Sequence, residues 1–162
     1  MGREAPLPPP PQLLLQLRFA EGQLQSKTMS YIQRALLLYG AGSISALAQA
    51  LIGFGLAESG LFLWAHTTLT PGVSGTSVYL KLVWGGLWAL AALFPGMSRL
   101  RGWQAALLLS LVPSVAQLLY FMPQSGAGWF GSAHGWGTPF VVLGLNALWA
   151  TLTLFLSNAR RG

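Results

Sequence analysis

Charge is scarce in this sequence, and cysteine is absent. Only 7% of the 162 residues are charged and 53% are apolar, whereas an ordinary globular domain carries about 25% charged residues. A water-soluble fold is therefore excluded. The lack of cysteine excludes disulfides, thiolate metal sites and cysteine nucleophiles. The nine Lys and Arg residues outnumber three Glu, but they stand singly or in pairs, so no basic face for nucleic acid is expected.

The sequence contains four long apolar stretches with little or no charge. A bilayer core about 30 Å thick needs about 20 apolar residues at about 1.5 Å per residue. The stretches that fit are residues 35–56, 78–94, 103–122 and 140–157. Helices are expected, because each backbone N–H in lipid must find a partner within its own segment. The sequence predicts an all-α fold, an integral membrane four-helix bundle over residues 29–162.

The positions of the basic residues predict an orientation for the bundle. With the N-terminus inside, the inner side collects all the Lys and Arg residues except Lys81, namely Arg3, Arg18, Lys27, Arg34, Arg99, Arg101, Arg160 and Arg161. Cytoplasmic loops of membrane proteins carry such an excess. Both termini are therefore expected in the cytoplasm.

Two segments outside the spans have less regular patterns. Residues 1–28 are Pro-rich and are expected to form a disordered N-terminal extension, with a short surface helix over 13–24 as one alternative. The MSYIQR stretch from Met29 resembles a short inner tail, so an upstream start choice is another reading. Residues 55–69 stay apolar beyond Glu58, and either continue the first helix or lie along the outer surface.

Three amide side chains fall inside the spans at a similar depth. Gln49, Gln117 and Asn146 each lie about 8 to 11 Å below the expected outer boundary, at about 1.5 Å per residue. Because unpaired amides in lipid cost several kcal/mol, they are expected to bond to one another. The layer is either interhelical glue or a small polar site opened by Pro113 and lined in part by Trp84. It contains no charged residue, which argues against a proton relay or an ion pump.

Residues capable of acid–base chemistry gather on the predicted outer side. Glu58, His66 and His134, with Lys81, could form an active site or a zinc site, but their spacing carries no metal signature. Histidines and a glutamate at helix ends are the ordinary alternative. The Gly-rich loop over residues 126–137 contains no Lys or Arg, so it is expected to be a compact turn rather than a phosphate loop. No metal or cofactor is expected.

Several motifs in the second half of the chain carry a resemblance. They are VWGGLW (83–88), SLVPSVAQL (110–118) and NALW (146–149), together with the glycines of the 126–131 loop. With these motifs the sequence resembles a family of small bacterial four-helix integral membrane proteins that has no assigned activity. The resemblance implies the four-span bundle and a place in the bacterial inner membrane, and it draws attention to Trp84, Pro113, Gln117, Pro139 and Asn146.

Small residues in the first two spans suggest how the protein acts. Gly42, Ala46 and Ala50 recur at every fourth position, as do Gly85 and Ala89, and such faces let helices approach closely. The leading hypothesis is an accessory or structural subunit without chemistry of its own, in a homo-oligomer or a larger membrane complex. It would act through helix contacts in the bilayer or through its outer loops. The alternative is a permease component that binds a small molecule or lipid at the amide layer. An enzyme using the outer-side residues is the third hypothesis.

Overall fold

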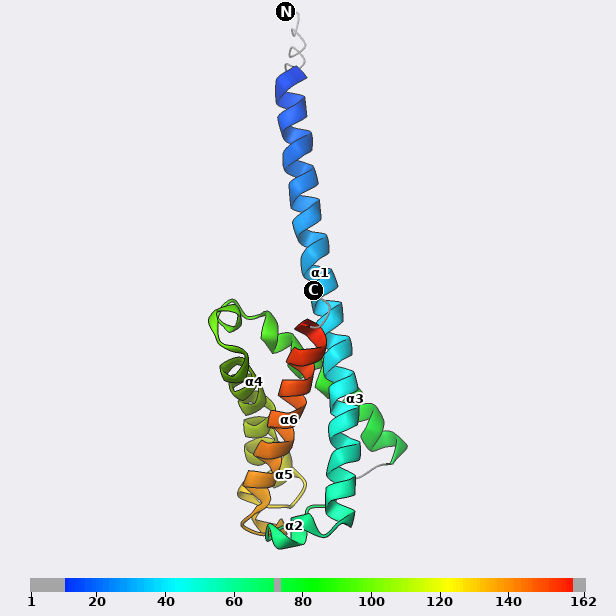
Figure 1. Cartoon of the computed structure of the whole chain (residues 1–162), viewed down its shortest axis with the longest axis vertical. Coiled ribbons are helices and arrows are strands. Elements are labelled where there is room, and N and C mark those ends of the chain that lie inside the picture. The colour runs from blue at the N-terminus through cyan, green and yellow to red at the C-terminus, as the bar shows by residue number, and fades with distance from the viewer. Residues whose placement is uncertain (1–10, 72–73, 159–162) are drawn as a thin grey trace, which may run out of the picture. The chain divides into compact units, whose positions relative to one another are not determined.

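A computed structural model describes residues 11–71 and 74–158 of the chain, and the regular structure within these ranges is helical (Figure 1). The chain divides into two units, residues 1–34 and 35–162. Four helical segments are long and apolar enough to cross a membrane, and they are Tyr31–Glu58, Gly75–Leu93, Gly102–Gln124 and Thr138–Ser157. The predicted all-α fold with four potential membrane spans is thus confirmed.

The first helix, α1, runs over Pro11–Glu58. Proline is tolerated in the first turn of a helix, where its missing N–H would be unpaired in any case. Residues 11–28 are helical, whereas the sequence predicts a disordered extension there. Residues 1–10 lie outside the described ranges.

The first span stops at Glu58, the last residue of α1. Gly60 adopts a left-handed conformation with φ of 78°, which favours glycine. The Ser59 hydroxyl donates a hydrogen bond to the Leu56 carbonyl at 2.8 Å. The helix does not continue, and the apolar residues beyond it form a separate short helix, α2, over Leu61–Trp64.

The second span is built from α3, Gly75–Ala89, and a 3₁₀ turn, η1, over Leu90–Leu93. It begins three residues before the predicted start, because the Ser74 hydroxyl accepts a hydrogen bond from the Ser77 N–H at 3.2 Å and caps the helix. A second 3₁₀ turn, η2, over Met97–Arg99 leads to the third span.

The third span changes its helical type midway. The α-helix α4, Gly102–Ala116, contains Pro113 and passes into a π-helical turn, η3, over Gln117–Phe121, followed by α5, Met122–Gln124. A π-turn inserts an extra residue into the helix and is frequent at functional sites. The sequence contains the proline but no clear sign of the π-turn.

The last span, α6, covers Thr138–Asn158 and packs along α4 (Figure 1). Between α1, α3 and α6 the contacts are close because the residues are small. A Cβ atom on Gly42 would overlap the Gly85 carbonyl oxygen and the Ala89 side chain. The Trp149 indole N–H also donates to the Gly42 carbonyl at 3.0 Å. The surrounding core consists of Leu38, Ala46, Ala89, Ala92, Ala106, Leu109, Trp149 and Ala150.

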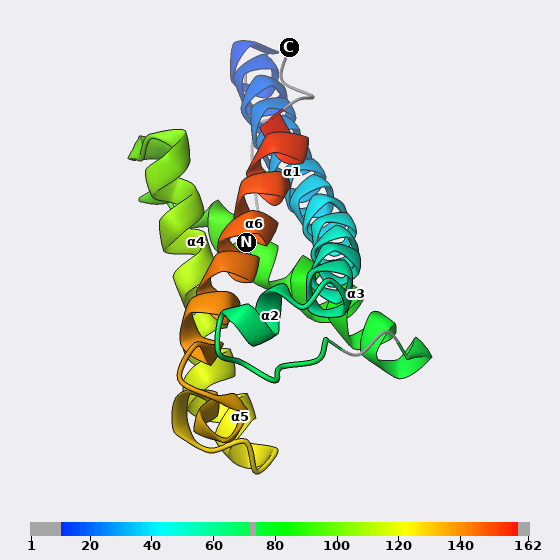
Figure 2. The ribbon, with the colours of Figure 1, turned by 60° about the horizontal axis from the view of Figure 1, so that its bottom comes forward.

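At one end of the bundle, the loop after α2 is fastened to the start of α6 (Figure 2). The hydroxyls of Thr67 and Thr138 share a buried hydrogen bond of 2.7 Å. The Thr68 N–H donates to the carbonyl of His134, at the end of the 3₁₀ segment η4, Trp129–His134, over 2.8 Å. These bonds fix the point from which residues 69–71 extend towards α3.

Candidate functional site

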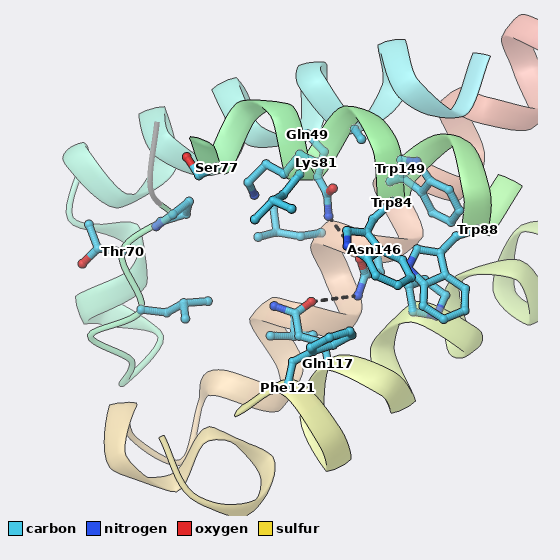
Figure 3. Close-up of a pocket in the computed structure, with 18 residues that line it drawn as sticks. Gln49, Thr70, Ser77, Lys81, Trp84, Trp88, Gln117, Phe121, Asn146 and Trp149 are labelled. Atoms are coloured by element: carbon cyan, nitrogen blue, oxygen red, sulfur yellow. Dashed lines mark hydrogen bonds between the residues drawn. The ribbon is translucent and has the colours of Figure 1, made fainter. Parts of the chain in front are cut away.

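A pocket of about 500 Å³ lies among α1, α3, α6 and the junction of α4 with η3 (Figure 3). Its volume falls within the range of about 300 to 1,000 Å³ that is usual for small-molecule sites. Residues of all four spans line it, together with the loop after α2: Ala46, Gln49, Leu69, Thr70, Pro71, Ser77, Leu80, Lys81, Trp84, Gly85, Trp88, Pro113, Gln117, Phe121, Val142, Leu145, Asn146 and Trp149. The walls are mainly apolar and the polar groups are few.

The three amides predicted to share a layer do meet, and Asn146 lies at their centre (Figure 3). Its Oδ1 accepts from Gln49 Nε2 at 3.2 Å, and its Nδ2 donates to Ser114 Oγ at 3.0 Å and Gln117 Oε1 at 3.5 Å. The Ser114 hydroxyl in turn donates to the Ser110 carbonyl. Asn146 is only 6% exposed, so its hydrogen-bonding groups are used within the protein.

The two glutamines keep hydrogen-bonding capacity at the pocket. Within the described ranges, no residue bonds to Oε1 of Gln49 or to Nε2 of Gln117. Both side chains line the pocket and are partly accessible. The pocket therefore has a free amide oxygen of Gln49 as acceptor and the free amide NH2 group of Gln117 as donor on its walls.

Lys81 adds a positive charge that the sequence does not place in this site. It extends from α3 into the pocket lining and is half-buried. It makes no hydrogen bond or salt bridge to any residue in ranges 11–71 and 74–158. The pattern alone favours a lysine that reaches out of the membrane near the end of its helix, whereas here its side chain lines a pocket shared with the amides.

Aromatic rings form the opposite end of the pocket. The Trp84 and Trp88 rings stack with centroids 5.7 Å apart, and Trp84 meets Phe121 edge to face at 5.9 Å. The second contact joins α3 to η3. Such pairs add about 0.5 to 1.5 kcal/mol beyond their burial, so they help to hold these two walls together.

The helical irregularity after Pro113 lies at the pocket wall. Pro113 lines the pocket and is buried, and it cannot donate a backbone hydrogen bond. The π-turn η3 begins at Gln117 and ends at Phe121, and both of these residues also line the pocket. The altered winding thus sets the direction of one amide and one ring at the site.

The outer-side candidates do not gather into a comparable site. Glu58 is exposed at the end of α1. His66, with φ of 55°, stacks on Trp136 at 4.9 Å, and His134 uses its carbonyl to hold Thr68. Among the described residues, no group of three His, Asp or Glu side chains could hold a metal ion. His66 and His134 belong to the connection between α2 and α6.

Of the pocket residues on α3, the sequence predicted Trp84 but missed Ser77, Lys81 and Trp88, although a signal for them exists. Ser77, Lys81, Trp84 and Trp88 are spaced four, three and four residues apart, which places them on one face of α3. This spacing predicts that the lysine and the tryptophans line the same site. The residues of the amide layer that the sequence did predict lie on the facing helices.

Comparison with protein-family models, with curated proteins and with solved structures found no match to this chain. The resemblance to the small bacterial four-helix family stays a prediction.

Proposed function

We propose that this protein is a multi-pass membrane protein that binds a small molecule or lipid in the pocket, as a component of a permease. The observation that carries the proposal is the pocket itself, which reaches Gln49, Gln117 and Asn146. A layer serving only to join helices would be closed and would pair its polar groups with one another. Apolar walls with a few convergent polar groups are typical of ligand sites.

The accessory-subunit hypothesis loses its main argument in this arrangement. The small-residue faces of the first two spans pack against each other within the chain, where Gly42 meets Gly85 and Ala89. They are therefore not free to pack against another subunit. Four spans are few for an autonomous transporter, so we propose that the permease forms through other surfaces, in a homo-oligomer or a larger complex.

Filling the pocket tests the proposal directly. Leu145 lines the pocket from α6, and Leu145→Trp places a large ring in its volume. We expect native mass spectrometry of the purified wild-type protein to show one bound molecule per chain that resists delipidation. The variant is expected to lose at least 90% of this species.

Leu111→Trp provides the matched control. Leu111 is 46% exposed on α4 and is not part of the pocket lining, so the same substitution there is expected to leave the bound species in place. Equal retention by both variants would identify the species as general boundary lipid and contradict the proposal. So would a wild-type protein that carries no bound molecule.

We also propose that both termini face the cytoplasm of a bacterial inner membrane, which places the amide layer in the outer half of the bundle. The excess of basic residues supports the orientation, and the family resemblance supports the compartment. Since the chain has no cysteine, single cysteines can report accessibility without background. Ser59 and Ser98 are matched sites, because both are exposed and each hydroxyl bonds to a carbonyl three residues earlier.

A membrane-impermeant maleimide is expected to label Ser59→Cys, which follows α1, on intact spheroplasts. Ser98→Cys, between α3 and α4, is expected to react only after permeabilisation. The gel shift from a polyethylene-glycol maleimide measures both. Labelling of Ser98→Cys alone on intact cells would reverse the proposed orientation.

A further inference from the structure

We propose that the ligand of the pocket is an anionic amphiphile, with its charged group against Lys81 and its apolar part against the tryptophans. This inference deepens the proposed function and rests on it. It concerns the chemical class of the ligand, which neither the presence of the pocket nor its volume determines.

Lys81 lacks a counter-charge within residues 11–71 and 74–158. A lysine within a membrane-spanning helix is costly unless it reaches water or pairs with an anion. Its side chain lines the pocket and has no ionic partner among the described residues. The chain holds three glutamates, Glu4, Glu21 and Glu58, and all of them precede α2 in the sequence. An anionic ligand would supply the counter-charge that the described part of the chain does not.

The polarity of the lining changes along the pocket. In Figure 3, the Lys81 ammonium lies towards Ser77, while Trp84 and Trp88 lie at the other end. From Lys81 to Trp88 the helix rises about 10 Å, at about 1.5 Å per residue. A ligand that fits both ends carries its charge and its apolar part on opposite sides, as an amphiphile does.

The direction of this change in polarity matches that of a lipid in a membrane. Lys81 is closer than the tryptophans to the first residue of α3, Gly75, and hence to the membrane surface at that end of the helix. A lipid in the adjacent leaflet also has its charge near the surface and its chain deeper in the membrane. The free Nε2 group of Gln117 lies on the facing wall, where it can donate to an oxygen between the two parts.

A spin-labelled fatty acid and its methyl ester provide a matched pair of probes for the protein in nanodiscs. Doxyl stearate carries a carboxylate, the ester has no charge, and both quench tryptophan fluorescence on contact. We expect saturable quenching by the acid that unlabelled stearate reverses, with the ester binding at least tenfold more weakly. A close pair of partly desolvated charges contributes about 1.5 kcal/mol or more, which corresponds to about tenfold in affinity.

Lys81→Met keeps an unbranched side chain one atom shorter and removes its charge. It is expected to weaken binding of the acid at least tenfold and to leave binding of the ester unchanged, while Lys81→Arg restores binding of the acid. Size-exclusion profiles and thermal unfolding identify any variant that is misfolded. In that event the comparison of acid with ester on the wild-type protein decides the question alone.

The remaining outcomes separate this inference from the proposed function. If acid and ester bind equally, and Leu145→Trp abolishes both, the pocket binds ligands but the anionic class is wrong. If inorganic phosphate displaces the acid at millimolar concentration, the ligand is a small anion and not an amphiphile. If neither probe gives saturable quenching, the inference fails, and the bound species seen by mass spectrometry still decides the proposed function.

Discussion

Replacing Gly42 with alanine is expected to lower the free energy of unfolding by about 1 to 3 kcal/mol, the usual cost of overpacking a close contact. The added methyl group would overlap the backbone oxygen of Gly85 and the side chain of Ala89. Neither atom belongs to a flexible chain end, so α1 and α3 must move apart. The movement would also strain the bond from the Trp149 indole to the Gly42 carbonyl.

The same substitution two residues earlier gives the control. Gly40 is in the same helix, and a Cβ atom there would meet no atom within 4 Å. Alanine is a better helix former than glycine by about 0.5 to 1 kcal/mol, so Gly40→Ala is expected to be neutral or slightly stabilising. Denaturation with sodium dodecyl sulfate in mixed micelles measures both variants. A loss of stability of the same size at both positions would show that Gly42 is not a close contact.

The spans of this fold could be predicted because lipid leaves few alternatives. The apolar stretches give four spans with ends within a few residues of the candidate spans in the structure, since each span must be long enough to cross the bilayer. The ends that differ depend on local chemistry. Ser74 starts α3 early by capping it, and Gly60 ends α1 within a segment whose hydropathy does not change.

The amide layer could be predicted for a related reason, together with Pro113 and Trp84 beside it, but the place of Lys81 in the pocket could not. Unpaired amides in lipid are costly enough that Gln49, Gln117 and Asn146 had to find one another. The Lys81 side chain can either reach the membrane surface or line an interior pocket, and its position in the sequence fits both. The choice depends on how α3 is rotated, which is set by the contact of Gly85 with Gly42.

The second large effect on stability is expected at Asn146, at the centre of the amide layer. Asn146→Leu keeps the branched shape and the number of heavy atoms of the side chain and removes three hydrogen bonds, to Gln49, Ser114 and Gln117. At about 0.6 to 1.7 kcal/mol for each interhelical bond, the free energy of unfolding is expected to fall by about 2 to 5 kcal/mol. Gln49→Leu removes one of these bonds and is expected to cost about a third as much.

Thr151→Val is the control on the same helix. The Thr151 side chain is exposed and bonds to the Ala147 carbonyl within α6, so its loss is expected to change stability by less than about 0.5 kcal/mol. In a double-mutant cycle, adding Gln49→Leu to Asn146→Leu should cost nothing further, because their shared bond is already gone. Additive losses would mean that the two amides act independently, and that the layer is not the connected network from which the pocket's free donor and acceptor were derived.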